Sequence, residues 1–421
     1  MNVRRRSAAA LAAIAVLGAA AAPAVAADPS PSASASKSTP AGLYGTADPQ
    51  YDGVWRQSLA MLAQDTVGVI PSATAVRWLT GQQCDNGAFA AYRADTAKPC
   101  DAKTMVDTNS TAAAVQALWA VGGHGDAVED ALAWLKTVQN KDGGWGYTPG
   151  GPSDANSTSV VIGALTATGT KPESVTKDGR TPYDALLTFA LPCSADKGAG
   201  AFAYQPDKDG KLLANDDATA AGVLGALGKG LVAEPGKAAG GGDAACAGGD
   251  KPTREQAAAN GAAHLTQAVA KDGHLMSALA GADPQPDYGN TADAVVALAA
   301  QGGADSAAKP LAWLEKNATA WAAQNGPAAY AQLILAAHAT GTDPRAFGGA
   351  DLVTQLNATG PTPQGVKDTA TASDEKDGKK DEAKDDKDDS PFGVWWFVGV
   401  CLVFGIGIGF VLSGRNRKQQ P

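Results

Sequence analysis

The apolar positions of residues 54–357 fall into helical stretches, and the alternating pattern of a β-strand is nearly absent. One kind of stretch begins with polar residues and continues as a run of small apolar residues, as in DTNSTAAAVQALWAVG from Asp107 and DANSTSVVIGALTATG from Asp154. The polar residues can accept hydrogen bonds from the free amides of a helix start, and the closing Gly suits a helix end. These helices are apolar nearly all round, which predicts that they are buried.

A second kind of stretch alternates with the first and ends in a loop that contains glycine and an aromatic residue. Examples are AVRWLTGQQCDNGAFAAY from Ala75 and ALAWLKTVQNKDGGWGY from Ala131. Trp78 and Trp134 lie beside polar faces, which predicts an outer position. The alternation therefore predicts an all-α fold of two concentric rings, with the odd-numbered helices inside. The predicted helices span 54–66, 72–83, 108–121, 126–140, 156–168, 182–191, 216–228, 253–270, 290–301, 307–323, 327–340 and 347–357.

One repeat carries a family resemblance. Trp134, Leu135 and Gln139 followed by Asp-Gly-Gly-Trp-Gly at 142–146 resemble the repeat of terpenoid cyclases and prenyltransferases. The resemblance spans roughly residues 50–357 and implies an α6/α6 toroid. Toroids of this kind also serve as squalene-hopene cyclases, protein prenyltransferases, complement thioester domains and cobalamin carriers, so the resemblance specifies the fold more than the function.

The two ends of the chain predict export and membrane anchoring. Arginines, an apolar run and Ala-Val-Ala resemble a signal peptide, and a late uncharged stretch is long enough to cross a bilayer. Acidic residues before that stretch and basic residues after it predict a single-pass cell-membrane protein with an extracellular ectodomain and a cytoplasmic C-terminus. The predicted segments are a signal peptide (1–26), a Pro/Ser/Ala linker (27–40), the toroid (41–360), a disordered acidic, lysine-containing stalk (361–390), the transmembrane helix (391–413) and a basic tail (414–421).

The composition excludes some partners and chemistries. The chain has a formal net charge of −9, which argues against nucleic acid as a partner. Only 6% of its residues are aromatic, whereas a carbocation needs aromatic faces for stabilisation. No C-x-x-C occurs and the four histidines are scattered, so no metal site is predicted.

Four cysteines fall in the predicted toroid, and export permits disulfides. Proximity along the chain favours Cys84 with Cys100, and Cys193 with Cys246. The sequence alone leaves three pairings open.

The sequence gives little support for an enzyme. The family resemblance implies an Asp-x-Asp-Asp motif whose middle Asp protonates an alkene. The nearest match is Ala214-Asn215-Asp216-Asp217, in which the first Asp is replaced. Asp216 and Asp217 are therefore weak catalytic candidates, and adjacent acids at a helix start often cap the helix. The predicted toroid also lacks a Mg²⁺-binding DDxxD, a zinc triad and the thioester sequence Cys-Gly-Glu-Gln.

We therefore expect a surface-anchored toroid that binds a small molecule where its loops enter the inner ring. Exported cobalamin carriers are similar in role, so the favoured ligand is a corrinoid or another bulky molecule passed to a membrane transporter. The alternatives are a terpenoid cyclase- or prenyltransferase-like enzyme acting on an isoprenoid, and a module that binds cell-wall polysaccharide or protein. The expected ligand-binding residues are Phe89, Tyr92, Asp107, Asn109, Trp145, Tyr147, Asp154, Asn156, Phe202, Tyr204, Asp216, Asp217, Tyr288 and Asn290.

Overall fold

The computed structural model describes residues 40–237, 246–277 and 284–367, which belong to one compact unit. This part is mostly helical, as predicted. The predicted signal peptide, transmembrane helix and basic tail lie outside the described residues, as do nearly all of the linker and most of the stalk. None of the helices in the described ranges has the length and apolar character needed to cross a membrane.

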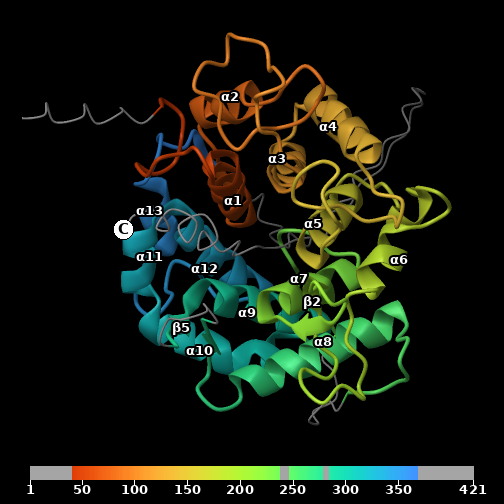
Figure 1. The fold of residues 1–421 in the computed structure, drawn as a ribbon. Helices are drawn as coiled ribbons and strands as arrows, with labels where there is room; N and C mark the ends of the chain where they lie inside the picture. Colours follow the sequence, from red (N-terminus) through yellow and green to blue (C-terminus); the bar gives the residue numbers. More distant parts are fainter. Residues whose placement is uncertain (1–39, 238–245, 278–283, 368–421) are drawn as a thin grey trace, which may run out of the picture. The chain divides into compact units, whose positions relative to one another are not determined.

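Six helices form the inner ring. Each packs against the next and the last packs against the first, so the ring is closed (Figure 1). Small residues permit this close packing: a Cβ atom on Gly225 of the seventh helix would lie 2.3 Å from the Oγ of Ser159 of the fifth. The inner helices are α1 (Gly53–Thr66), α3 (Thr108–Val121), α5 (Ala155–Ala167), α7 (Asp216–Ala226), α9 (Tyr288–Gly302) and α12 (Pro327–Thr340).

The remaining helices lie outside this ring (Figure 1). The amphipathic ones, α2 and α4, bury Trp78 and Trp134 against the inner ring and expose their polar faces. The outer helices are α2 (Ala73–Gly81), α4 (Gly125–Thr137), α6 (Pro182–Leu187), α8 (Arg254–Val269), α10 (Ala308–Asn317), α11 (Thr319–Asn325) and α13 (Leu352–Asn357), with short 3₁₀ turns η1 (Pro172–Ser174) and η2 (Ala304–Ala307).

Three predicted outer helices differ from the structure. The helix predicted over 307–323 divides at Ala318, where the Asn317 side chain donates to the Trp313 carbonyl and competes with the backbone. The helix predicted over 347–357 starts only at Leu352, because Gly348 and Gly349 have positive φ. The helix predicted over 182–191 ends at Leu187, since the following residues pair with the loop near Phe202.

Short antiparallel pairs close the loops of the described ranges. β1 (Val69–Ile70) pairs with β6 (Gly365–Val366), β2 (Ala203–Pro206) with β3 (Leu212–Ala214), and β4 (Leu275–Met276) with β5 (Pro286–Asp287). The β1–β6 pair corrects the predicted start of the disordered stalk at 361. Residues 361–367 continue the fold, and Lys367 forms an ion pair with Asp65 at 2.6 Å.

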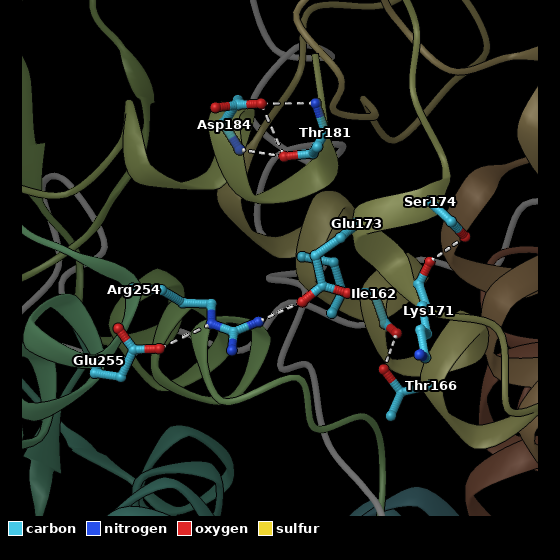
Figure 2. Close-up of polar contacts among 9 residues, drawn as sticks. All are labelled: Ile162, Thr166, Lys171, Glu173, Ser174, Thr181, Asp184, Arg254 and Glu255. Atoms are coloured by element: carbon cyan, nitrogen blue, oxygen red, sulfur yellow. Dashed lines mark hydrogen bonds and ion pairs between the residues drawn. The ribbon is translucent and has the colours of Figure 1, made fainter. Parts of the chain in front are cut away.

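Polar contacts tie the outer connections together. The Arg254 guanidinium lies between Glu173 of η1, at 2.8 Å, and Glu255 (Figure 2). The same group lies 4.5 Å above the Tyr183 ring of α6. Arg254 therefore links the start of α8 to Glu173 and Tyr183, which precede it by more than 70 positions.

The two disulfides join the pairs that proximity favoured, Cys84–Cys100 and Cys193–Cys246. The first closes a loop of 16 residues. We expect the double variant Cys84→Ser/Cys100→Ser to lose about 3 kcal/mol of unfolding free energy, because an open loop gains entropy when the chain unfolds. Urea unfolding of the variant and of the oxidised wild type measures the difference. Identical midpoints would contradict this expectation.

Candidate functional site

The N-termini of α3, α5, α7 and α9 lie at one end of the ring, which we call the inner-ring mouth. Asn156 of α5 donates to Asp217 Oδ2 of α7 at 2.7 Å, which joins two of these N-termini directly. Each helix begins with an Asx side chain that accepts a backbone N–H three residues later, so one of the free amides of each helix start is already used. These caps are Asp107 to Ser110 (2.6 Å), Asp154 to Ser157 (2.6 Å), Asn215 to Ala218 (2.7 Å) and Asp287 to Asn290 (3.0 Å).

A threonine four residues after each cap holds the loop that enters the ring. For example, Thr158 Oγ1 accepts the Trp145 amide at 3.1 Å. The four pairs of threonine and loop residue are Thr111 with Phe89, Thr158 with Trp145, Thr219 with Phe202, and Thr291 with Leu275. The spacing Asx-x-x-x-Thr is thus a signal in the sequence for where the loops attach.

Four of the predicted aromatic positions are not available at the mouth. Phe89, Trp145 and Phe202 are at most 1% exposed, so they fill the core beneath their loops and offer no ring face to a ligand. Tyr92 stacks on Trp78 with ring centroids 6.5 Å apart, beside a cavity of about 320 Å³ on the outer side of α2. These four aromatic residues are therefore not part of the proposed site.

Three tyrosines remain at the mouth. Tyr147 and Tyr204 are 37% and 42% exposed, and the Tyr204 hydroxyl lies 3.5 Å from Asp154 Oδ2. Tyr288 is the first residue of α9. The centroid of its ring lies 4.9 Å from that of Trp313 and 5.5 Å from that of Trp321. The two tryptophans were not predicted to be near the site, because they reach it from α10 and α11 through tertiary packing.

Asp217 has an unusual environment. Its Oδ2 accepts the hydrogen bond from Asn156, whereas its Oδ1 is buried and has no partner. Burial raises the pKa of Asp217 to about 7; the Asn156 hydrogen bond opposes this shift, and the carboxylates of Asp287, Asp154 and Asp216 add to it. A substantial fraction of Asp217 is therefore neutral and carries a proton near pH 7.

Two capping carboxyls, like Asp217, have raised pKa values. Burial raises the pKa values of Asp107 and Asp154 to about 6, although hydrogen bonds from Ser110 and Ser157 oppose the shift. Burial and the nearby carboxylates also raise the pKa values of Tyr147 and Tyr204, which keeps both phenols protonated. The mouth therefore gains negative charge as the pH rises from 5 to 8.

We expect the stability of the chain to fall as the pH rises from about 4 to about 7. Because the pKa of Asp154 is higher in the folded chain than in the unfolded chain, the folded chain binds more protons in this interval, and a higher pH favours unfolding. The titration of Asp154 accounts for about 3 kcal/mol of this loss of unfolding free energy. Asp154→Asn keeps a capping side chain but removes the titration, so urea unfolding across this range should show a weaker pH dependence. Equal slopes for variant and wild type would contradict this account.

Asp216 has a different setting. It is 36% exposed at its side chain and lies 2.9 Å from His264 Nε2 of α8. His264 was not among the predicted site residues, because 48 positions separate it from Asp216 along the chain. The two adjacent acids therefore have distinct partners: a histidine for Asp216 and an amide for Asp217.

Unpartnered amide oxygens complete the mouth. The Oδ1 atoms of Asn109, Asn156 and Asn290 are buried without a hydrogen-bond partner. Asn109 and Asn156 are each 2% exposed and occupy the same position, two residues after the cap, in neighbouring helices. Within the described ranges, no three His, Cys, Asp or Glu side chains are grouped as a metal site.

Comparison with known proteins agrees with the repeat. Residues 54–202 match the family described as the prenyltransferase alpha-alpha toroid domain. This segment therefore resembles a prenyltransferase-type toroid domain. A stretch of 65 residues is 45% identical to drimenyl diphosphate synthase from Streptomyces showdoensis, covering 14% of this chain and 12% of that protein. This stretch of the chain is therefore similar to a terpenoid synthase, and the match covers only a small part of that protein.

Solved structures show a more distant likeness. An ent-copalyl diphosphate synthase from Streptomyces platensis is 15% identical with a TM-score of 0.45, over 69% of this chain and 50% of that one. A protein from Actinoplanes is 14% identical with a TM-score of 0.44, over 71% of this chain and 93% of that one. This chain thus matches only half the length of the synthase.

Proposed function

We propose that the toroid is a terpenoid cyclase-like enzyme in which Asp217 donates a proton to an isoprenoid at the inner-ring mouth. The observation that carries the proposal is the buried, unpartnered Oδ1 of Asp217, a carboxyl whose raised pKa of about 7 keeps a substantial fraction of it protonated near pH 7. A general acid must hold its proton at the working pH, and the raised pKa of Asp217 meets this requirement. The related drimenyl diphosphate synthase supports an isoprenoid as the substrate class.

The hydrogen bonds of Asp217 determine which oxygen carries the proton. Oδ2 already accepts from Asn156, so the proton resides on Oδ1, which has no partner. In the proposed step, the O–H bond breaks and the π pair of an alkene forms the new C–H bond, leaving a carbocation. The carboxylate that remains keeps its Asn156 donor and lies at the N-terminus of α7, where the helix dipole favours negative charge.

Conversion of an isoprenoid tests this proposal. The purified protein is incubated with squalene, farnesyl diphosphate and geranylgeranyl diphosphate, and the products are separated by gas chromatography with mass spectrometry. We expect a cyclised product from one of these substrates. Unchanged substrate in every incubation would overturn the proposal.

Capture of a bulky ligand is a second candidate, which the three unpartnered amide oxygens and the half-exposed Tyr147 and Tyr204 favour. A corrinoid passed to a membrane transporter is the ligand class that the sequence suggested. Titration with cobalamin and cobinamide by calorimetry separates this candidate from the first. Absence of binding at about 100 µM, which corresponds to about −5.5 kcal/mol, would exclude it.

We also propose that the toroid works outside the cell on a membrane anchor. The two disulfides support an oxidising compartment. Proteolysis of intact cells checks the proposal, since an exposed toroid is cleaved without lysis. Protection of the toroid until the cells are lysed would contradict it.

A further inference from the structure

The unpartnered groups at the inner-ring mouth have one property in common. The Oδ1 atoms of Asn109, Asn156 and Asn290 are all hydrogen-bond acceptors, and each is buried without a donor. A buried polar atom without a partner costs about 1–3 kcal/mol, so three of them at one mouth call for a ligand that supplies donors. Asn109 and Asn156 are each 2% exposed, so their amide oxygens are withdrawn from bulk solvent.

Bare helix N-termini attract anions, but these N-termini are partly occupied. Each of the caps Asp107, Asp154, Asn215 and Asp287 accepts one of the N–H groups that a phosphate would otherwise bind. Three of those caps are themselves carboxyls. What the mouth offers is therefore oxygen atoms and negative charge.

We infer that the inner-ring mouth recognises a positively charged, hydrogen-bond-donating group, such as an ammonium, with the Asn109, Asn156 and Asn290 amide oxygens as acceptors. The inference rests on the proposed function in that it concerns the same site. In the proposed reaction, the same amide oxygens stabilise the positive charge that protonation of an isoprenoid creates. It also places any diphosphate of the substrate away from this mouth, since the neighbouring carboxylates repel it.

The charge of the mouth changes with pH in a direction that supports this assignment. Asp217 on α7 faces Asn156 and Asp154 on α5, Asp287 at the start of α9 and Tyr204 on β2, while its neighbour Asp216 contacts His264 of α8. As the pH rises from about 5 to about 8, the buried carboxyls ionise and the attraction for a cation increases. Affinity for an ammonium should therefore rise over this interval, and affinity for a phosphate should fall.

Three soluble probes with the same alkyl chain test the inference by calorimetry on the full chain. They are hexylammonium, with charge and N–H donors; hexyltrimethylammonium, with charge alone; and hexyl phosphate, an anion. We expect hexylammonium to bind at least about tenfold more tightly than hexyl phosphate, with hexyltrimethylammonium between them. Tighter binding of hexyl phosphate, or no binding of hexylammonium at about 10 mM, would overturn the inference.

Variants locate the binding. Asn109→Leu and Asn156→Leu keep the side-chain size while removing the amide, and each should weaken hexylammonium binding about tenfold. The matched control is Gln301→Leu, because Gln301 also has a buried unpartnered amide oxygen but lies at the opposite end of α9. An equal loss in Gln301→Leu would contradict the assignment to the mouth. The comparison of probes on the wild type does not depend on how well the variants fold.

The outcome is separable from that of the proposed function. Cyclised product without hexylammonium binding would overturn this inference alone. Hexylammonium binding that depends on Asn109 and Asn156, without conversion of any isoprenoid, would overturn the enzyme proposal alone.

Discussion

Replacement of Asp217 by asparagine is expected to lower isoprenoid conversion by about 10²- to 10⁴-fold, the contribution typical of a general acid. Asparagine has nearly the same shape and still accepts the Asn156 hydrogen bond through its oxygen, but it has no acidic proton. The loss should therefore appear in the rate of product formation while the urea midpoint stays near that of the wild type or rises, because a buried carboxyl that is costly to ionise is removed. Single-turnover product analysis measures the rate.

Two controls sharpen this prediction. Asp126→Asn changes an acid in the first turn of the outer helix α4 and should leave conversion unchanged. Asp216→Asn compares the second candidate acid, which contacts His264. A larger loss in Asp216→Asn than in Asp217→Asn would move the proton donor to Asp216, and full activity in both would remove acid catalysis from this site.

Replacement of Trp145 by alanine is expected to cost about 3–5 kcal/mol of unfolding free energy. Trp145 is 1% exposed, and its Nε1 donates to the Leu135 carbonyl at 2.7 Å. The variant leaves a cavity and an unpaired carbonyl at the junction of α4, its loop and α5. Urea unfolding measures the change.

Tyr147 is the matched control, since it lies two residues away in the same loop but is 37% exposed. Tyr147→Ala should cost less than about 1 kcal/mol, as expected for a partly exposed side chain. If both variants unfold at the same urea concentration, Trp145 is not the structural residue that its burial indicates.

Most of the architecture could be predicted because it depends on local signals. The cap of α3 at Asp107, its run of small residues and its final Gly122 are all within one stretch of sequence, and the predicted and observed helices share both ends. The failures occurred where local signals conflict. Asn317 divides a helix through its own side chain, and Gly348 and Gly349 delay the start of another.

The candidate site could be predicted only in part. The polar residues two positions after the caps, such as Asn156 and Asp217, were selected because they begin inner helices. The loop aromatics were selected by the same logic, yet Trp145 is in the core and Tyr147 is at the mouth. A residue type at a loop position does not specify which way the side chain faces when the loop packs.

By itself the sequence determined the helices, their alternation between two rings and the caps that close the helix starts, since neighbouring residues make those hydrogen bonds and apolar faces. Only the tertiary structure decided which groups meet at the mouth. Asn156 lies beside Asp217 across 61 positions, and Asp216 lies beside His264 across 48. The raised pKa of Asp217 and the unpartnered amide oxygens follow from burial. Burial depends on contacts among four helices, and no single stretch of the chain contains them.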